Sequence, residues 1–321
     1  MGRFGRRKDN PAERAQMTRA ISPFADGQAA RWIVDILEAD QMTPLSFAAL
    51  AASIGLMYLV GARMFASARF GVVTVALFAL TPLLWRQSQH APASLDPLPF
   101  VVGWLLAVAH FQPAQATRWP VVAGGLLGVG VYTSHAAAVM MPLYLLLTIA
   151  VVAHARAASL RQLVLLVAAF SVAVSPLAVS LVRLPEGFRN TINAYHLYDA
   201  NRFNVRQGIH EMASWVGLTA RSEVYYDYFN PAFLFLTGRV LLLPLVVLLP
   251  AGLFQIVSDE TTPLPRLSMA GFLAAPFAAS LTAEAPTPGR ILFITPFAAI
   301  VSAYGMKRLL AWLGWTSVPS P

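Results

Sequence analysis

The chain has 321 residues, of which 57% are hydrophobic and only 12% are charged, and its formal net charge is +8. Soluble domains carry about 25% charged residues, so this composition excludes an ordinary soluble globule, and the apolar content excludes intrinsic disorder. The lack of cysteine excludes a disulfide scaffold. The composition therefore predicts an all-α fold, namely a polytopic transmembrane helical bundle.

Apolar runs predict about nine membrane spans, because a hydrocarbon core about 30 Å thick needs roughly 20 apolar residues per helix. Prolines lie inside several of these runs, among them Pro82, Pro142 and Pro176. In chain order, the predicted spans are 44–62, 70–86, 97–112, 119–134, 136–154, 161–183, 239–257, 267–282 and 290–313.

Two polar stretches divide the chain. In the N-terminal head, Trp32, Ile33, Ile36 and Leu37 recur at helical spacing, which predicts a helix lying on the membrane surface. We expect no signal peptide in the head, because no apolar core follows its basic residues. The predicted parts are a basic head with an interfacial helix (1–43), an N-terminal transmembrane bundle (44–183), an extracytoplasmic loop region (184–238), C-terminal transmembrane helices (239–313) and a tail (314–321).

Basic residues in the short turns predict the orientation. Arg86 and Arg290 occupy turns on one side, which also holds the 184–238 loop, and the positive-inside rule places this side outside the cytoplasm. The opposite turns carry Arg63, Arg69, Arg118, Arg156, Arg161, Arg266, Lys307 and Arg308. Such scattered charges are not the basic stripe of a nucleic-acid-binding protein. The basic head then falls outside, against the rule, so either it is translocated or a preceding transmembrane helix is missing from this chain.

Four blocks of sequence resemble, in order, the bacterial membrane glycosyltransferases of family 39, which have the GT-C fold and include protein O-mannosyltransferases and the aminoarabinose transferases of lipid A. The blocks are VGARMFASARFGVVTVALFALTPLLWRQSQ (60–89), GLLGVGVYTSHAAAVMMPLYLLL (125–147), FNPAFLFLTG (229–238) and SLTAEAPTPGR (280–290). The family's first helix and its catalytic acidic loop have no counterpart that can be matched.

The resemblance implies an enzyme of the bacterial cytoplasmic (inner) membrane, surrounded by membrane lipids. It implies transfer of a sugar from a polyprenyl-phosphate donor to a lipid, glycan or protein acceptor at the outer face. It implies neither a cofactor nor a metal, and the scattered histidines agree with that expectation.

Such a transfer needs a carboxylate that takes the acceptor's proton and cations that hold the departing phosphate. Asp26, upstream of the interfacial helix, is the candidate base, and the alternative is a solvated carboxylate of the head. Arg290 matches the family's arginine and is the candidate phosphate contact, with Glu284 as the matching acidic residue; the alternative for Arg290 is an interfacial topology residue. Thr287 stands where the family often has His.

Polar residues of the other outward turns complete the predicted substrate site. Arg86 and His90 flank one turn and are candidate donor contacts. Asp96 is the only acidic residue between positions 41 and 185, and an ionisable group beside a span is a functional candidate, although Asp-Pro also favours a helix N-cap. His135, in the turn YTSH, is a candidate cavity residue. Tyr226 is a candidate acceptor contact in an aromatic group made of Tyr195, His196, Tyr225, Tyr226, Tyr228 and Phe229.

Two other functions remain open. A non-catalytic GT-C-like membrane scaffold, or an accessory protein, would bind a polyprenyl lipid without transferring a sugar, and the unmatched acidic loop and the short connection after Gly238 favour it. A transporter often shows repeated halves, and this sequence shows no such repeat.

Overall fold

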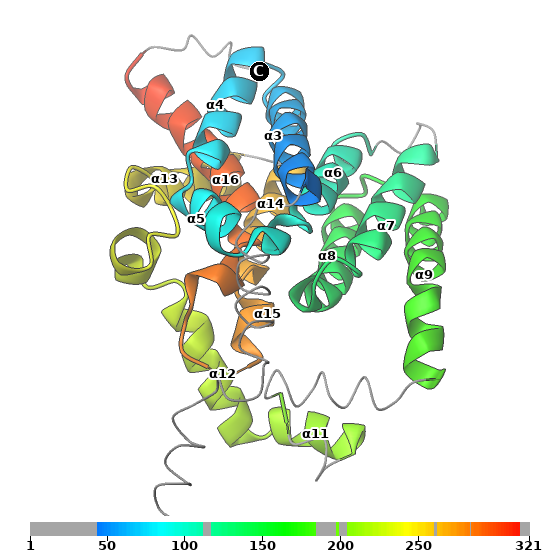
Figure 1. The fold of residues 1–321 in the computed structure, drawn as a ribbon. Helices are drawn as coiled ribbons and strands as arrows, with labels where there is room; N and C mark the ends of the chain where they lie inside the picture. Colours follow the sequence, from blue (N-terminus) through cyan, green and yellow to red (C-terminus); the bar gives the residue numbers. More distant parts are fainter. Residues whose placement is uncertain are drawn as a thin grey trace, which may run out of the picture.

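The computed structural model describes residues 44–111, 117–183, 197–198, 204–259, 262–282 and 284–314. Within them every regular element is helical (Figure 1), which confirms the all-α prediction. Asp26 and the predicted interfacial helix lie outside the described residues, as do Tyr195 and His196.

The first half of the described chain is a series of apolar helices. Its elements are α3 (Pro44–Met64), α4 (Ala68–Ala79), α5 (Pro82–His90), the 3-10 turn η1 (Pro92–Leu95), α6 (Leu98–Val108), α7 (Arg118–Gly130), α8 (His135–His154) and α9 (Leu160–Arg183). Pro142 and Pro176 lie inside α8 and α9, as predicted.

The second half begins with two polar helices and then returns to apolar ones. Its elements are α11 (Val205–Met212), α12 (Trp215–Asp227), the π-helical turn η2 (Ala232–Thr237), α13 (Leu245–Asp259), α14 (Pro263–Ala274), α15 (Phe277–Ser280), the 3-10 turn η3 (Pro288–Ile291) and α16 (Ile294–Trp312). Asn204 and Gln207 form a capping box at the start of α11, and the Ser214 hydroxyl accepts from Gly217 N at the start of α12.

Three helical segments of the described chain are long and apolar enough to cross a membrane: Ser46–Met64, His135–His154 and Leu160–Ser180. The pair α4–α5 is a fourth candidate, bent by 50°. Pro82 explains the bend, because it begins α5 while Thr81 before it is extended (φ −61°, ψ 120°). The predicted span 70–86 is thus interrupted. Two further apolar segments, Pro92–Val108 and Leu245–Ser258, are shorter.

Glycines allow the closest helix crossings. A Cβ on Gly124 or Gly128 of α7 would collide with the backbone or side chains of α9, and a Cβ on Gly252 of α13 would collide with the carbonyl of Val301. A Cβ on Gly305 of α16 would likewise collide with the carbonyl of Leu248. Helices in lipid gain stability from such close backbone approach, because burial of apolar surface does not drive their association there.

A tyrosine contacts the backbone of α9 on both sides of Pro176. Proline cannot donate a backbone hydrogen bond, so the helical ladder opens at this point. The Tyr132 hydroxyl, from the turn after α7, donates to Ala173 O at 2.9 Å and accepts from Leu177 N at 3.2 Å. One side chain therefore satisfies two backbone groups on either side of the proline.

The core lies where α6, α8 and α16 meet. The Trp104 and Tyr144 rings stack with centroids 5.1 Å apart, and the Phe297 ring lies 5.4 Å from Tyr144. Trp104 Nε1 donates to Thr148 Oγ1 at 3.1 Å. These contacts tie the two halves of the sequence into one bundle.

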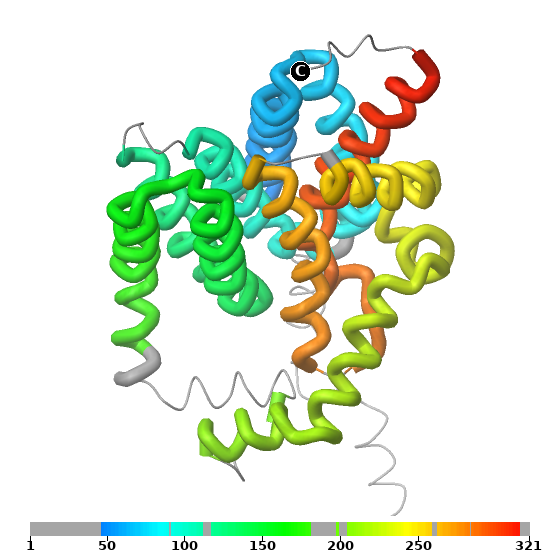
Figure 2. The backbone as a smooth tube through the Cα atoms, turned by 180° about the vertical axis from the view of Figure 1, so that it is seen from behind, coloured from blue at the N-terminus to red at the C-terminus, as the bar shows by residue number. Residues whose placement is uncertain are grey.

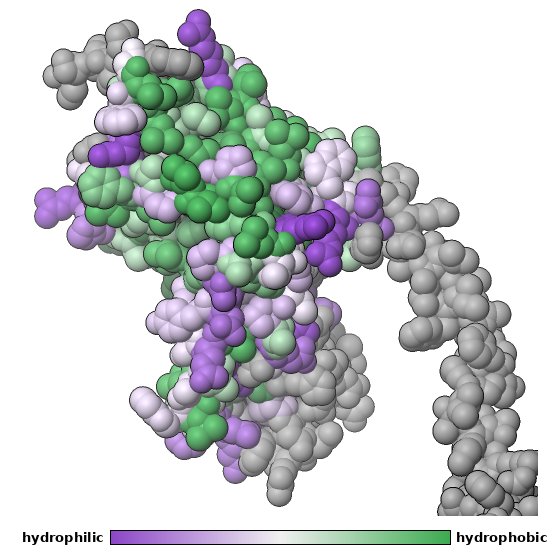
Figure 3. All heavy atoms as spheres, turned by 90° about the vertical axis from the view of Figure 1, so that its left-hand side faces the viewer, coloured by the Kyte–Doolittle hydropathy of each residue, from purple (hydrophilic) through white to green (hydrophobic). Residues whose placement is uncertain are grey.

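Five of the basic turns and helix ends lie toward the same end of the bundle, upward in Figure 1. They are the turn from α3 to α4, the starts of α7 and α14, the turn from α8 to α9 and the C-terminal end of α16. The sequence predicted this grouping from charge alone. Elements α11 and α12 lie at the opposite end, where α11 runs across the direction of α9 (Figures 1 and 2). Figure 3 shows an apolar upper body and a more hydrophilic lower part on the face in view.

Candidate functional site

Polar contacts connect the ends of several elements that the sequence predicted to face outward. Arg86 Nη1 donates to Gly238 O at 3.5 Å, which links α5 to the end of η2. Ser94 Oγ donates to Gln87 Oε1 at 3.2 Å, which links η1 to α5. Gly289 lies against the same glutamine, since a Cβ on it would stand 2.9 Å from Gln87 Nε2. Segments far apart in the sequence, α5, η1, η2 and η3, therefore converge on one surface, which we term the outward site.

The centre of the outward site is Arg290, in η3. Its Nη2 atom lies 2.5 Å from Glu284 Oε2, and its Nη1 atom donates to Thr282 Oγ1 at 3.0 Å. The two charged side chains are 36% and 42% exposed, so they are open to a ligand. The sequence predicted Arg290 and Glu284 as members of one site, and the structure pairs them directly.

Tyr228 forms the floor beside this pair. Its side chain is fully buried, and its hydroxyl accepts from Thr287 N at 3.3 Å. Burial raises the pKa of the Tyr228 phenol, while the Thr287 contact and the Arg290 charge partly oppose the rise. Tyr228 therefore stays neutral. Residue 287 contacts Tyr228 through its backbone N–H. The sequence placed Tyr228 in an acceptor platform, so this role was missed.

Asp96 lies near the outward site but does not cap a helix. It has helical backbone angles (φ −57°, ψ −31°) at the end of η1, and the N-cap of α6 is Pro97. The structure therefore places the N-cap one residue after Asp96. Instead, Asp96 Oδ1 accepts from Ser46 Oγ of α3 at 3.1 Å. The half-buried carboxylate stands two residues from Ser94, which is part of the outward site.

The two predicted histidines stand at helix ends. His90 is the last residue of α5, four positions after Arg86, and its side chain lies outside the described residues. His135 is exposed and opens α8, whose N-cap is Ser134, with its hydroxyl accepting from Ala137 N at 3.1 Å. His135 therefore lies in a different turn from the Arg290 pair.

The described part of the predicted acceptor platform divides into packed and exposed rings. Tyr225 donates its hydroxyl to Leu273 O at 2.7 Å, and its ring lies 5.4 Å from that of Phe229. Tyr228 is buried, as above. Tyr226 is 70% exposed, with its ring set edge-on to Tyr225. Of these four rings, Tyr226 is the one most open to an acceptor.

Arg221 of α12 fastens the polar helices to the bundle. Its Nε, Nη1 and Nη2 atoms each donate at 3.0 Å, to the carbonyls of Leu281, Gly217 and Leu197 respectively. Burial lowers the pKa of this guanidinium, and the Glu211 charge opposes that shift. The sequence predicted a charged loop here. It did not identify Arg221 as the residue that joins α12 to other segments, because the acceptors of its hydrogen bonds are backbone carbonyls.

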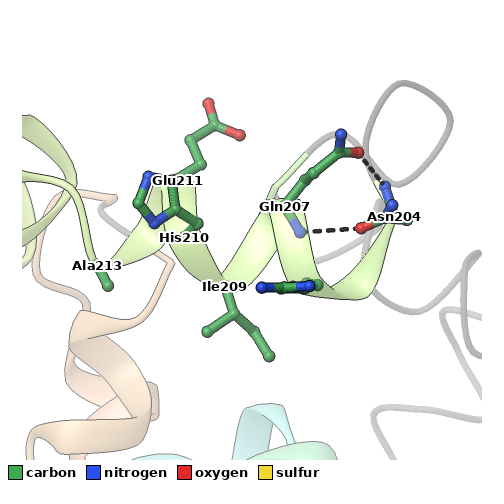
Figure 4. A pocket seen from close by; sticks show the side chains of 7 residues that line it. Asn204, Gln207, Ile209, His210, Glu211 and Ala213 are labelled. Carbon is green, nitrogen blue, oxygen red and sulfur yellow. Dashed lines mark hydrogen bonds between the residues drawn. The ribbon is translucent and has the colours of Figure 1, made fainter.

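A pocket of about 1000 Å³ lies at α11, away from the Arg290 pair. In Figure 4 the Asn204–Gln207 capping box closes one end of this helix, and Ile209 and Glu211 point in opposite directions. The pocket contains none of the predicted site residues. The outward site is the candidate functional site, because charge and hydrogen-bond donors converge there.

The described residues hold no group of three or more His, Cys, Asp or Glu side chains that is able to bind a metal ion. No protein-family model matches the chain, and no curated protein matches it. The relationship to family-39 glycosyltransferases therefore remains a hypothesis, carried by the four sequence blocks and by the residues of the outward site.

Proposed function

We propose that this chain is a GT-C-like membrane glycosyltransferase of the bacterial cytoplasmic membrane. It takes a sugar from a polyprenyl-phosphate donor and transfers it to a lipid, glycan or protein hydroxyl at the outer face. The observation that carries the proposal is the pairing of Arg290 with Glu284 beside the buried Tyr228. Guanidinium groups bind phosphate oxygens through two parallel N–H donors.

Arg290 is the phosphate-binding residue in this proposal. Its guanidinium exchanges the Glu284 carboxylate and the Thr282 hydroxyl for phosphate oxygens of the donor. Arg86, exposed on α5 and joined to the same surface, adds positive charge. Together they favour the negative charge that develops on the phosphate as the sugar departs.

The transfer step forms one bond and breaks another. An acceptor hydroxyl oxygen attacks the anomeric carbon, the bond from that carbon to the phosphate oxygen breaks, and its electron pair stays on the phosphate. A carboxylate receives the acceptor's proton. Asp26 is the predicted base, and Asp96 is a second carboxylate near the site.

The proposal includes the nine-span arrangement. Three or four apolar spans are present by length and composition. Five further segments make up the nine spans in this proposal: Pro92–Val108, α7, Leu245–Ser258, the α14–α15 pair and α16. Short or interrupted helices of this kind can cross a membrane, because packing against neighbouring helices satisfies their irregular backbone at membrane depth.

A donor-turnover assay in liposomes tests the function. Polyprenyl-phosphate mannose, glucose and aminoarabinose are supplied in turn, and release of polyprenyl phosphate is measured. The proposal expects release from one donor, strongly reduced by Arg290→Gln and unchanged by Arg239→Gln, an exposed arginine of the same region.

The non-catalytic scaffold has one observation in its favour, since Arg290 is already satisfied within the chain by Glu284 and Thr282. Binding of polyprenyl phosphate without release of sugar from any donor would select the scaffold over the enzyme.

A further inference from the structure

The end of the bundle opposite the outward site carries a cluster of aromatic rings beneath basic side chains. Phe65, in the turn from α3 to α4, stacks on Phe70 with centroids 5.0 Å apart and meets Tyr304 of α16 at 4.5 Å. We refer to these rings, together with Phe254, Arg63, Arg69, Lys307 and Arg308, as the basic–aromatic patch.

Lys307 and Arg308, two consecutive cations of α16, each lie over an aromatic ring. The Lys307 ammonium stands 6.0 Å above the Tyr304 ring. The Arg308 guanidinium stands 4.4 Å above the Phe254 ring of α13, and its Nη1 atom donates to Gln255 Oε1 at 3.0 Å. These contacts fix where the charges lie, because the rings and the amide hold the long side chains in place.

Further positive charge and apolar surface adjoin the patch. Arg63 and Arg69 are exposed on the α3–α4 turn. Val72 of α4 is 59% exposed, and Phe254 and Val257 of α13 are 57% and 68% exposed. Fixed cations at the edge of an exposed apolar surface match a molecule with an anionic head and a hydrocarbon tail.

We propose that the basic–aromatic patch binds the headgroup of an anionic phospholipid in the cytoplasmic leaflet. The phosphate lies by Lys307 and Arg308, and the acyl chains run along the exposed side chains of α4 and α13. The basic helix ends place the patch on the cytoplasmic side by the positive-inside rule, and the anionic lipids of that leaflet complement its charge. This site is separate from the proposed transferase site and does not depend on it.

The test compares two double variants of equal charge. Lys307→Gln with Arg308→Gln removes the two ring-held cations, while Arg156→Gln with Arg161→Gln removes two cations from the α8–α9 turn at the same end of the bundle. Affinity for phosphatidylglycerol and for phosphatidylcholine is measured by native mass spectrometry of the detergent-solubilised chain. Near a membrane each cation contributes about fivefold to anionic-lipid binding, so the first pair is expected to weaken phosphatidylglycerol binding by about 30-fold.

The outcomes separate a specific site from general attraction. The proposal expects the α8–α9 pair to keep most of its phosphatidylglycerol affinity and phosphatidylcholine to bind weakly throughout. Equal losses in both double variants would overturn it, as would competition by inorganic phosphate as effective as that by the lipid. If the first double variant does not purify as a single species, the single variants Lys307→Gln and Arg308→Gln are compared with the α8–α9 pair instead. Each is expected to lower the affinity for phosphatidylglycerol by about fivefold.

Discussion

Replacing Arg290 with glutamine is expected to weaken donor binding strongly while leaving the fold nearly intact. The ion pair with Glu284 joins side chains that are 36% and 42% exposed, and exposed ion pairs contribute about 0.2–1 kcal/mol. The hydrogen bond to Thr282 adds about 0.5–1.5 kcal/mol. The free energy of unfolding should therefore fall by only about 1–2 kcal/mol.

Binding should respond far more than stability. Hydrogen bonds to charged groups contribute about 1.5–3 kcal/mol, which corresponds to a loss of about 10- to 150-fold in affinity for polyprenyl phosphate. Binding is followed in detergent micelles by titration calorimetry, and stability by thermal unfolding of the same preparations.

Glu284→Gln provides the matched comparison. It breaks the same ion pair but keeps the guanidinium and its hydrogen bond to Thr282. Stability should therefore fall by only about 0.2–1 kcal/mol, while polyprenyl phosphate binds as tightly as before or more tightly. A fall of more than about 3 kcal/mol in Arg290→Gln would show that the pair is structural. Equal loss of binding in both variants would refute the assignment of phosphate binding to Arg290.

Three further predictions concern stability. Tyr132→Phe should lower thermal stability by about 1–2 kcal/mol, because it leaves two backbone groups of α9 unsatisfied, whereas Tyr58→Phe on the exposed face of α3 should change little; equal effects would contradict the bridging role. Gly252→Leu should destabilise the bundle by about 1–3 kcal/mol or prevent folding, while Gly55→Leu, with no neighbouring atom within 4 Å of its Cβ position, should be tolerated. Burial raises the pKa of Tyr228 above its usual 10.0, so its contribution to stability is complete below about pH 10 and lost as pH rises through the raised value; thermal unfolding between pH 8 and 11 should show this loss, and Tyr228→Phe should show less of it.

The sequence predicted the all-α class because its signals are strong and local, while three or four of the nine predicted spans meet the length and apolarity of a membrane crossing. Long apolar runs identify helices, and single basic residues at their ends identify one side of the bundle. Pro82 shows the limit of this reasoning. A proline inside an apolar run either stays within one helix, as Pro176 does, or starts a new one, as Pro82 does. At Pro176 the Tyr132 hydroxyl contacts backbone groups on both sides of the proline, a tertiary contact that the residue types do not reveal.

The outward site was predictable only in part. The resemblance predicted Arg290 and Glu284 as members of one site, but their direct ion pair was not predicted. Asp96 binds Ser46, 50 residues away, rather than capping the next helix. The contacts made by Tyr228 and Arg221 are to backbone groups of other segments. Every residue type except proline offers the same backbone donor and acceptor. The residue types therefore do not reveal which backbone groups Tyr228 and Arg221 contact.

Both proposals depend on the sidedness of the chain, which one labelling experiment tests directly. The chain contains no cysteine, so single cysteines serve as unique labels. Ala93→Cys lies exposed on η1 by the outward site, and Ala68→Cys lies exposed at the start of α4 by the basic–aromatic patch. In intact cells with the outer membrane permeabilised, a membrane-impermeant maleimide should label position 93 at once and position 68 only after the inner membrane is broken. Labelling of position 68 in intact inner membranes, with position 93 protected, would contradict the account.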